Sequence, residues 1–222
     1  MKKLSVILPC LNEEASIGKS IETIQSVFKK NNLSGEIIVV DNNSTDKTAE
    51  IAKNYPVVYI LEKNLGYGNA YKTGFKQAIN EIIIMGDPDG TYDFNEIPNF
   101  LKELDNSDFV LGNRFNKIEK NAMPFLHRYI GNPILRFMFH HIYGLKTQEV
   151  CTGFVALKKE TLEKINPQQP GMEFSSELII KAKKNNLKIK EVPITYHKRK
   201  GKSKLKTIKD GLRHIRYILS PK

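Results

Sequence analysis

The chain has 222 residues, of which 40% are hydrophobic and 27% charged, with a formal net charge of +11. This composition supports a packed domain and excludes a collagen-like or globally disordered chain. Residues 181–222 hold 15 of the 35 Lys and Arg but two of the 24 Asp and Glu, so a near-neutral body carries a basic end. Such an end suits nucleic acid, an anionic membrane surface or a phosphorylated substrate.

The first 115 residues alternate short apolar runs with helical patterns. The apolar runs predict strands at residues 4–8, 36–40, 57–61, 81–85 and 109–111. Apolar residues three or four positions apart predict helices at residues 16–28, 46–53, 70–79 and 97–104. This alternation is typical of βαβ units, so we predict an α/β fold with a Rossmann-like, doubly wound and mostly parallel sheet. Ligands of such sheets bind beyond the carboxyl ends of the strands, where Asp41 and Asp87 fall.

The second half of the chain is less regular. Residues 123–144 are apolar around much of their circumference, and residues 174–182 predict a helix. Residues 189–192 predict a strand that ends at Pro193. From Leu205 onward one helical face is apolar and Lys or Arg occupies much of the rest, which predicts a basic amphipathic C-terminal helix.

Targeting and disulfide signals are weak. No apolar run reaches the ~18 residues of a membrane span, and the N-terminus leads directly into a predicted strand, so we expect no signal peptide. Two cysteines, Cys10 and Cys151, provide neither a disulfide framework nor a zinc site. We expect Cys10 to be a buried structural thiol and the protein to be cytoplasmic.

Two carboxylates follow the fourth predicted strand, in the run Gly86-Asp87-Pro88-Asp89-Gly90. Residues of these types also form ordinary turns. However, Asp87 and Asp89 are two positions apart at the expected ligand edge, where they can share one hard cation. Proteins usually hold Mg²⁺ with one or two carboxylates plus substrate phosphates, and the cation then stabilises a diphosphate leaving group. The pattern therefore favours a metal site.

Polar residues also follow the first two strands. Asp41 is a candidate for hydrogen bonds to a base or ribose, whereas Asp46 is expected to cap the next helix. Glu13 either contacts a nucleotide or interacts with the positive end of the following helix, and its position alone favours neither. The run GYGNAYKT at residues 66–73 is not a phosphate loop, because Tyr71 stands where the Walker and dinucleotide patterns both need glycine. We interpret it as a loop and helix start near the ligand edge.

Nine short motifs, in order along nearly the whole chain, match one family. They are PCLNE at 9–13, VVDNNSTD at 39–46, GYGNA at 66–70, DPD at 87–89, GNRF at 112–115, HRYIGN at 127–132, CTGF at 151–154, EFSSEL at 173–178 and GKSKL at 201–205. The chain resembles the family 2 glycosyltransferases of GT-A fold, and among them the polyprenyl-phosphate sugar synthases. The resemblance implies one GT-A domain over residues 1–222. Within it lie a nucleotide-sugar half (1–115), an acceptor-side half (116–200) and a basic tail (201–222).

The resemblance also assigns residues to the nucleotide-sugar donor, which would be UDP- or GDP-linked. Those matching the family's base and ribose contacts are Pro9, Leu11, Glu13 and Asp41. Asp87 and Asp89, with Pro88 between them, would bind Mg²⁺ or Mn²⁺ on the diphosphate, and Asp89 would act in catalysis. Thr91 departs from the pattern, because some mannose synthases have a Gln there that assists the metal.

Basic residues would serve the acceptor and the phosphates. By the resemblance, Arg114 and Arg128 lie near the transferred sugar and the acceptor phosphate, while Arg199 and Lys204 belong to a basic loop that closes over the phosphates. That loop reads Lys198-Arg199-Lys200 here, so which of the three reaches phosphate stays open.

The implied reaction is an inverting transfer of a hexose to a polyprenyl phosphate. A monophosphate with a second pKa of about 6 is already largely dianionic near neutral pH and needs no general base. Positive charge is needed instead, to bring two anions together. The alternative is a hydroxyl acceptor in a polysaccharide or glycolipid, which requires a base. Glu149, which stands where relatives usually have Asp, and Glu177 are the candidates for that base.

The expected partner surface is a membrane. The apolar stretch at 134–143 and the basic C-terminal helix fit an enzyme resting peripherally on the cytoplasmic membrane face. Many relatives continue into transmembrane helices, so attachment through a membrane-anchored partner protein is a further expectation. Nucleic acid is not an expected partner, because the basic tail lacks interleaved aromatic residues and a nucleic-acid motif.

Overall fold

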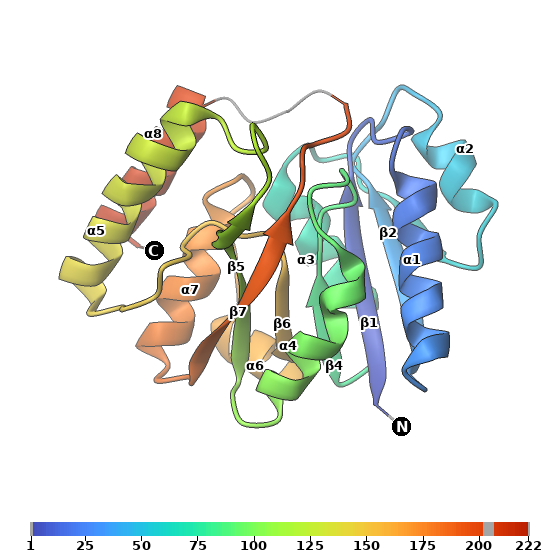
Figure 1. The fold of residues 1–222 in the computed structure, drawn as a ribbon, viewed down its shortest axis with the longest axis horizontal. Coiled ribbons are helices and arrows are strands. Elements are labelled where there is room, and N and C mark those ends of the chain that lie inside the picture. Colours follow the sequence, from blue (N-terminus) through green and yellow to red (C-terminus); the bar gives the residue numbers. More distant parts are fainter. Residues whose placement is uncertain (1, 202–206, 222) are drawn as a thin grey trace.

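The computed structural model describes residues 2–201 and 207–221 and confirms the predicted α/β architecture (Figure 1). One sheet has the strand order β3-β2-β1-β4-β6-β5-β7. The strands are β1 (Lys3–Cys10), β2 (Ser34–Asp41), β3 (Val58–Leu61), β4 (Ile82–Met85), β5 (Phe109–Ile118), β6 (Val155–Lys158) and β7 (Ile189–Tyr196). Neighbouring strands are parallel except around β6, which is antiparallel to both β4 and β5.

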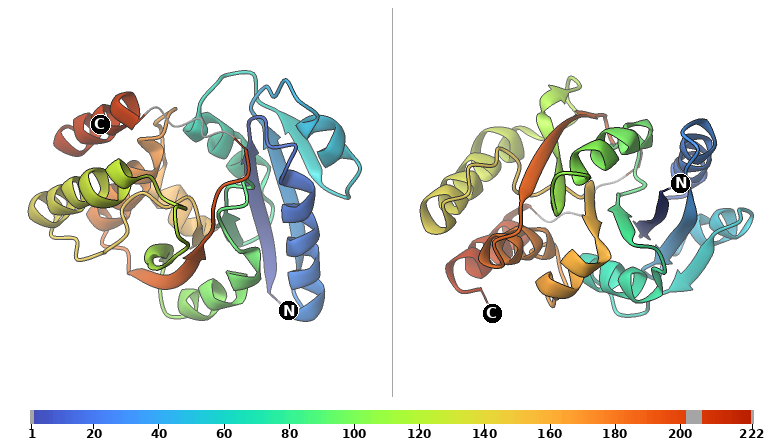
Figure 2. Two further views of the ribbon diagram at one scale, coloured as in Figure 1. Left: turned by 45° about the horizontal axis from the view of Figure 1, so that its top comes forward. Right: turned by 90° about the horizontal axis from the view of Figure 1, so that it is seen from below.

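Helices cover both faces of the sheet (Figure 2), and each face of the sheet has its own apolar cluster. One face packs against α1 (Ile17–Lys30), α2 (Thr48–Lys53) and α4 (Ile97–Leu104). The other packs against α3 (Tyr67–Gln77), α5 (Asn132–Tyr143), α6 (Lys159–Ile165), α7 (Phe174–Lys184) and α8 (Thr207–Leu219). Helix α1 shows why the helices pack in this way. Its residues Ile17, Ile21 and Ile24 share one helix face because of their spacing, and all three are buried. Among the described residues, no helix combines the length and apolarity that crossing a membrane requires.

The second half of the sheet departs from the sequence-based prediction. The strand β6 and the helix α6 were not predicted, because four residues with no clear alternation carry little signal. β5 continues to Ile118, and the predicted boundary at residue 115 therefore falls within a strand. The prediction that Pro193 ends its strand is wrong. β7 lies at the edge of the sheet, where a residue without an N–H group is tolerated.

The strand ends that matter for function meet at one edge of the sheet. Cys10 at the end of β1 pairs with Asp41 at the end of β2, and Ile7 of β1 pairs with Met85 at the end of β4. The segments that follow these three strands therefore lie together, as ligand-binding loops do in doubly wound sheets. Cys10 itself is buried, as expected.

Candidate active site

A cavity of about 730 Å³ opens at this edge, and we call it the edge cavity. Its wall includes most of the residues singled out from the sequence, namely Pro9, Leu11, Glu13, Asp87, Pro88, Asp89, Arg114 and Arg199. The wall then continues with apolar side chains of α5 and the turn before it, which include Met123, Leu126 and Leu135, and with polar side chains of α8. One continuous cavity thus joins the paired carboxylates to a wall that is apolar on its α5 side and polar on its α8 side.

Asp89 is held in place by its own turn. Its Oδ1 atom accepts hydrogen bonds from the backbone N of Thr91 at 2.9 Å and from the Thr91 hydroxyl at 2.6 Å. The side chain is almost fully buried, so these bonds fix its orientation. Thr91 thus orients a carboxylate, which is a different task from that of the Gln found in some mannose synthases.

Asp87 meets two phenols. Oδ1 of Asp87 lies 3.0 Å from the Tyr67 hydroxyl and 3.1 Å from the Tyr71 hydroxyl, and both donate to it. Burial, and then the nearby charge of Asp89, raise the pKa of Asp87 from its ordinary 3.8 to about 7. A positive charge beside this pair of carboxylates would therefore be favoured.

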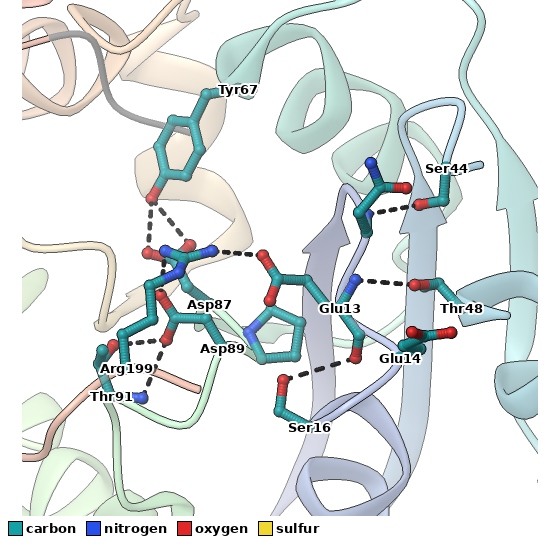
Figure 3. A network of polar contacts seen from close by, with 12 residues as sticks. Glu13, Glu14, Ser16, Ser44, Thr48, Tyr67, Asp87, Asp89, Thr91 and Arg199 are labelled. Atoms are coloured by element: carbon teal, nitrogen blue, oxygen red, sulfur yellow. Dashed lines mark hydrogen bonds and ion pairs between the residues drawn. The ribbon is translucent and has the colours of Figure 1, made fainter. Parts of the chain in front are cut away.

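Arg199 supplies a positive charge beside these carboxylates (Figure 3). Its guanidinium donates to Oδ2 of Asp89 at 2.5 Å and also to Oε1 of Glu13. The loop that carries it is fixed by backbone hydrogen bonds, from His197 N to Thr91 O and from Lys200 N to Asp89 O, both 2.9 Å. Of the three basic residues in the loop, Arg199 points into the edge cavity, while Lys198 and Lys200 are exposed.

Arg114 forms a bidentate ion pair with Glu149. The Nε–Oε2 distance is 2.7 Å and the Nη2–Oε1 distance is 2.8 Å, and Glu149 is completely buried. Oε1 of Glu149 also accepts from the backbone N atoms of Val150 and Cys151, both at 2.9 Å. Glu149 lies outside the cavity wall, behind Arg114. Its carboxylate therefore orients Arg114 and is poorly placed to act as a base.

Asp41, the last residue of β2, and Asp46, in the loop after it, both accept hydrogen bonds from residues close by. Asp41 accepts from Ser44 N at 2.9 Å and from the Tyr59 hydroxyl at 2.8 Å, and it lies behind the cavity wall, which Asn42 lines instead. Asp46 accepts from the backbone N of Thr48, the first residue of α2, at 2.9 Å. The N-cap position of α2 is Lys47, so Asp46 supports the start of the helix from one residue before the predicted position.

Two predicted basic residues are not brought to the cavity by the described structure. The Arg128 guanidinium lies 5.4 Å from the centre of the Tyr129 ring, outside the cavity wall. Lys204, and Leu205 next to it, fall outside the described residues. His127, beside Arg128, does line the cavity, and its Nε2 atom lies 2.9 Å from the Thr207 hydroxyl.

Sequence reasoning missed the partners of Asp87. Tyr67 and Tyr71 are four positions apart, so on a helix they share one face. This spacing was present in the sequence, but the contact with Asp87 depends on how α3 packs against the sheet. Gly153 was also missed. A Cβ atom there would lie 2.3 Å from Oδ2 of Asp87, which is why the motif at 151–154 needs glycine.

The raised pKa of Asp87 predicts a pH-dependent gain in stability on neutralising it. Between pH 4 and 7 the folded protein keeps a proton that the unfolded chain releases, so the carboxylate lowers stability as the pH rises through this window. We expect Asp87→Asn to raise the unfolding midpoint of the metal-free protein at pH 8 by about 2–4 °C, the shift that ~1 kcal/mol produces at this size. Thermal unfolding in EDTA should show the difference shrinking toward pH 4. A gain that is constant with pH would contradict the assignment.

The model of the family described as Glycosyl transferase family 2 matches residues 5–165, more than half of the chain. The chain belongs to this family. The predicted resemblance and the GT-A-type fold are thereby confirmed. The edge cavity of this family 2 protein is accordingly our candidate active site.

Individual relatives agree with this membership. The chain is 38% identical, over 97% of its length, to the low-salt glycan biosynthesis hexosyltransferase Agl6 of Haloferax volcanii, of which it spans 53%. It is 33% identical, over 96% of its length, to the dolichol-phosphate mannosyltransferase of Pyrococcus furiosus, of which it spans 62%. The chain therefore covers little more than half of the length of these two relatives.

Solved structures share the fold. Glucosyl-3-phosphoglycerate synthase from Mycobacterium tuberculosis, in complex with Mn²⁺, UDP and glucosyl-3-phosphoglycerate, superimposes with a TM-score of 0.75. The alignment covers 98% of this chain and 78% of the synthase at 21% identity. At that identity the likeness extends to the architecture alone.

Proposed function

We propose that this family 2 protein is a metal-dependent, inverting glycosyltransferase that moves a hexose from a UDP- or GDP-sugar to a polyprenyl phosphate at a membrane surface. The observation that carries the proposal is the edge cavity, which runs from the paired carboxylates past Arg114 to apolar side chains of α5 and the turn before it. A charged sugar nucleotide and a lipid-linked acceptor need such a two-sided site. The dolichol-phosphate mannosyltransferase among its relatives supports the same class of acceptor.

The residues at the donor end fit a divalent cation. Asp87 and Asp89 provide carboxylate oxygens side by side, and a guanidinium already bridges Asp89 to Glu13. No cluster of three or more His, Cys, Asp or Glu able to hold a metal occurs among the described residues. Proteins usually bind Mg²⁺ through one or two carboxylates, and substrate phosphates provide further ligands. Mn²⁺ accepts the same oxygen ligands. The Mn²⁺ and UDP bound by the mycobacterial synthase support this reading. When bound, the cation would offset the charge of the diphosphate leaving group.

Side chains of the protein itself would bind and orient the donor and the acceptor. Arg199 would leave Asp89 when that carboxylate takes a cation, and its guanidinium would then be available to the donor phosphates. Arg114, kept charged and oriented by Glu149, would attract the acceptor phosphate toward the donor. Asp41 and the loop after β1 would shape the pocket for base and ribose. We keep Arg128 and Lys204 as proposed phosphate contacts on the grounds of the family motifs.

The environment of the candidate bases favours a phosphate acceptor over a hydroxyl. Glu149 is committed to Arg114 and to two backbone N–H groups. Glu177 is fully buried, accepts from the backbone N atoms of Gln168 and Gln169, and pairs with Lys181 at 2.8 Å. Neither carboxylate lines the edge cavity. An acceptor that carries its own negative charge needs no such base.

An exposed apolar surface beside the acceptor end supports contact with lipid. In α5 and the turn before it the exposed apolar residues are Phe125, Leu126, Tyr129, Ile130, Ile134, Phe137 and Ile142. In α8, which lies beside α5 (Figure 1), the buried face carries Asp210, His214, Tyr217 and Ile218, while Ile208, Leu212 and Leu219 are exposed. Exposed cations, among them Arg136, Lys209 and Arg216, flank these residues. Apolar and cationic side chains combined in this way suit an anionic membrane interface.

A transfer assay tests the proposed function. Radiolabelled UDP-glucose, UDP-GlcNAc or GDP-mannose is incubated with polyprenyl phosphate and either Mg²⁺ or EDTA. We expect one donor to yield an organic-extractable product in Mg²⁺ and none in EDTA. Transfer to a polyprenol or glycan but not to the phosphorylated lipid would overturn the acceptor assignment, and equal transfer in EDTA would overturn the metal assignment.

Removing the Arg199 side chain is expected to increase the affinity for the metal and to lower turnover. In Arg199→Ala no guanidinium competes with a cation for Oδ2 of Asp89. This variant should therefore bind Mn²⁺ about tenfold more tightly in the absence of donor, which corresponds to ~1.4 kcal/mol. Turnover should fall by roughly 100-fold because the phosphates lose a cation. Calorimetric Mn²⁺ titration and the transfer assay measure the two effects. Lys198→Ala removes the same charge from an exposed position of the loop and should leave Mn²⁺ affinity nearly unchanged.

A further inference from the structure

Asp87 is held on one side by a pair of tyrosines from α3. Tyr67 and Tyr71 are one helical turn apart, so both hydroxyls point from the same helix face toward β4. They converge on a single atom, Oδ1 of Asp87, at 3.0 and 3.1 Å (Tyr67 is labelled in Figure 3). Tyr67 is also 3.4 Å from Oδ2. A carboxylate oxygen that accepts two hydrogen bonds has a fixed orientation.

The two phenols have little freedom to move. The Tyr71 side chain is fully buried and lies parallel to the ring of Phe174, at an interplanar angle of 3° and a centroid distance of 5.6 Å. Tyr67 meets Tyr71 edge-on at 5.0 Å and Phe174 edge-on at 6.2 Å. Aromatic packing of this kind fixes ring positions by burial and by preferred geometry.

Glycines place the start of α3 against its neighbour. Gly68 N donates to Pro170 O at 3.0 Å, and a Cβ atom at Gly68 would lie 2.0 Å from Gln169 O. Any side chain at position 68 would therefore displace the start of α3, and Tyr67 with it, from its place against residues 169 and 170. The glycine-rich run at 66–70, which is not a phosphate loop, has a physical role in docking this helix.

The opposite side of Asp87 is bounded by Gly153. A Cβ atom there would lie 2.3 Å from Oδ2 of Asp87 and 2.6 Å from the Tyr67 hydroxyl. The carboxylate is thus confined between two phenols on α3 and the backbone of the loop before β6. Its partners on the α3 side are neutral, unlike Arg199 at Asp89, so they orient the carboxylate without neutralising it.

We propose that Tyr67 and Tyr71 are positioning residues that hold Asp87 in one orientation and thereby set the affinity of the site for a divalent cation. The inference rests on the proposed metal dependence. Committing Oδ1 to two phenols fixes the carboxylate and removes in advance the freedom that the side chain would otherwise lose on binding a cation. Partners of this kind typically change metal affinity by about 10- to 100-fold.

The test measures binding of Mn²⁺ alone to the full chain. Free Mn²⁺ is followed by electron paramagnetic resonance for wild type, Tyr67→Phe, Tyr71→Phe and the double variant, without donor. We expect affinity to fall by about tenfold in the double variant, with smaller losses in the singles. In the transfer assay the Mn²⁺ concentration for half-maximal rate should rise, whereas the rate at saturating Mn²⁺ should stay within a few-fold of wild type. A purely structural role would not separate these two quantities.

Tyr143→Phe is the matched control, because it removes a phenol that donates to Ile218 O at 2.6 Å, away from the site. It should leave Mn²⁺ affinity unchanged. Wild-type affinity in a folded double variant would overturn the positioning role and leave the proposed function intact. If the double variant does not fold, Tyr67→Phe, whose side chain is only partly buried, decides the question by the same criterion. Failure of wild type itself to bind Mn²⁺ would instead contradict the proposed metal dependence.

Discussion

Replacing Asp89 with Asn is expected to lower metal-dependent hexose transfer by at least about 10³-fold while the chain stays folded. Asn keeps the shape of Asp and can still accept the hydrogen bonds from Thr91 through its Oδ1 atom. What it loses is the negative charge that now pairs with Arg199. The variant therefore removes the charge and preserves the turn.

The transfer assay measures this loss, and thermal unfolding verifies the fold. Asp93→Asn is the matched control, because Asp93 lies four positions along the same loop, where Oδ1 accepts from Asn95 N at 3.0 Å and caps a short helix. It should retain metal-dependent transfer. Wild-type turnover in Asp89→Asn would show that the carboxylate pair does not bind the cation.

Truncating Glu149 is expected to have the largest effect on stability. Glu149→Ala leaves the Arg114 guanidinium buried without its counter-ion, and breaking a buried ion pair in this way costs about 3–5 kcal/mol. Two backbone N–H groups, of Val150 and Cys151, lose their acceptor as well. The unfolding midpoint should fall by about 10 °C or more, and urea denaturation gives the free energy directly.

Two further variants show whether burial is the cause. Asp105→Ala breaks the exposed ion pair with Lys2, whose N–O distance of 2.6 Å is just as short, and should cost less than ~1 kcal/mol. Replacing Arg114 and Glu149 together by Leu should cost much less than Glu149→Ala alone, because no charge is left unpaired. Equal losses for Glu149→Ala and Asp105→Ala would contradict this account.

The nucleotide half of the fold was readable from the sequence because its signals are local. Four of the five strands predicted in residues 1–115 end within about two residues of their observed ends, and the helix at 97–104 has the predicted bounds. Since parallel strands end at a common edge, the positions of Glu13, Asp87 and Asp89 near one cavity followed from the strand assignments. Alternation and helical spacing are properties of neighbouring residues, so they survive without tertiary information.

The second half was less readable because its elements depend on partners distant in sequence. Whether Pro193 interrupts a strand depends on whether that strand is an edge, which is a property of the whole sheet. Glu149 and Glu177 were candidate bases on the grounds of residue type alone. Hydrogen bonds to Arg114 and to the backbone of Gln169 turn Glu149 and Glu177 into structural groups, and the spacing of the motifs does not reveal these contacts.

The sequence by itself determined the fold class, the family and the edge at which the carboxylates gather, because each of these follows from local periodicity or from ordered motifs. Tertiary structure alone decided which charges meet. Arg199 reaches Asp89 across 110 positions and Arg114 reaches Glu149 across 35, and two tyrosines of α3 converge on Asp87. Such pairings depend on how helices and loops pack onto the sheet, and packing is set by contacts throughout the chain rather than by the spacing of neighbours.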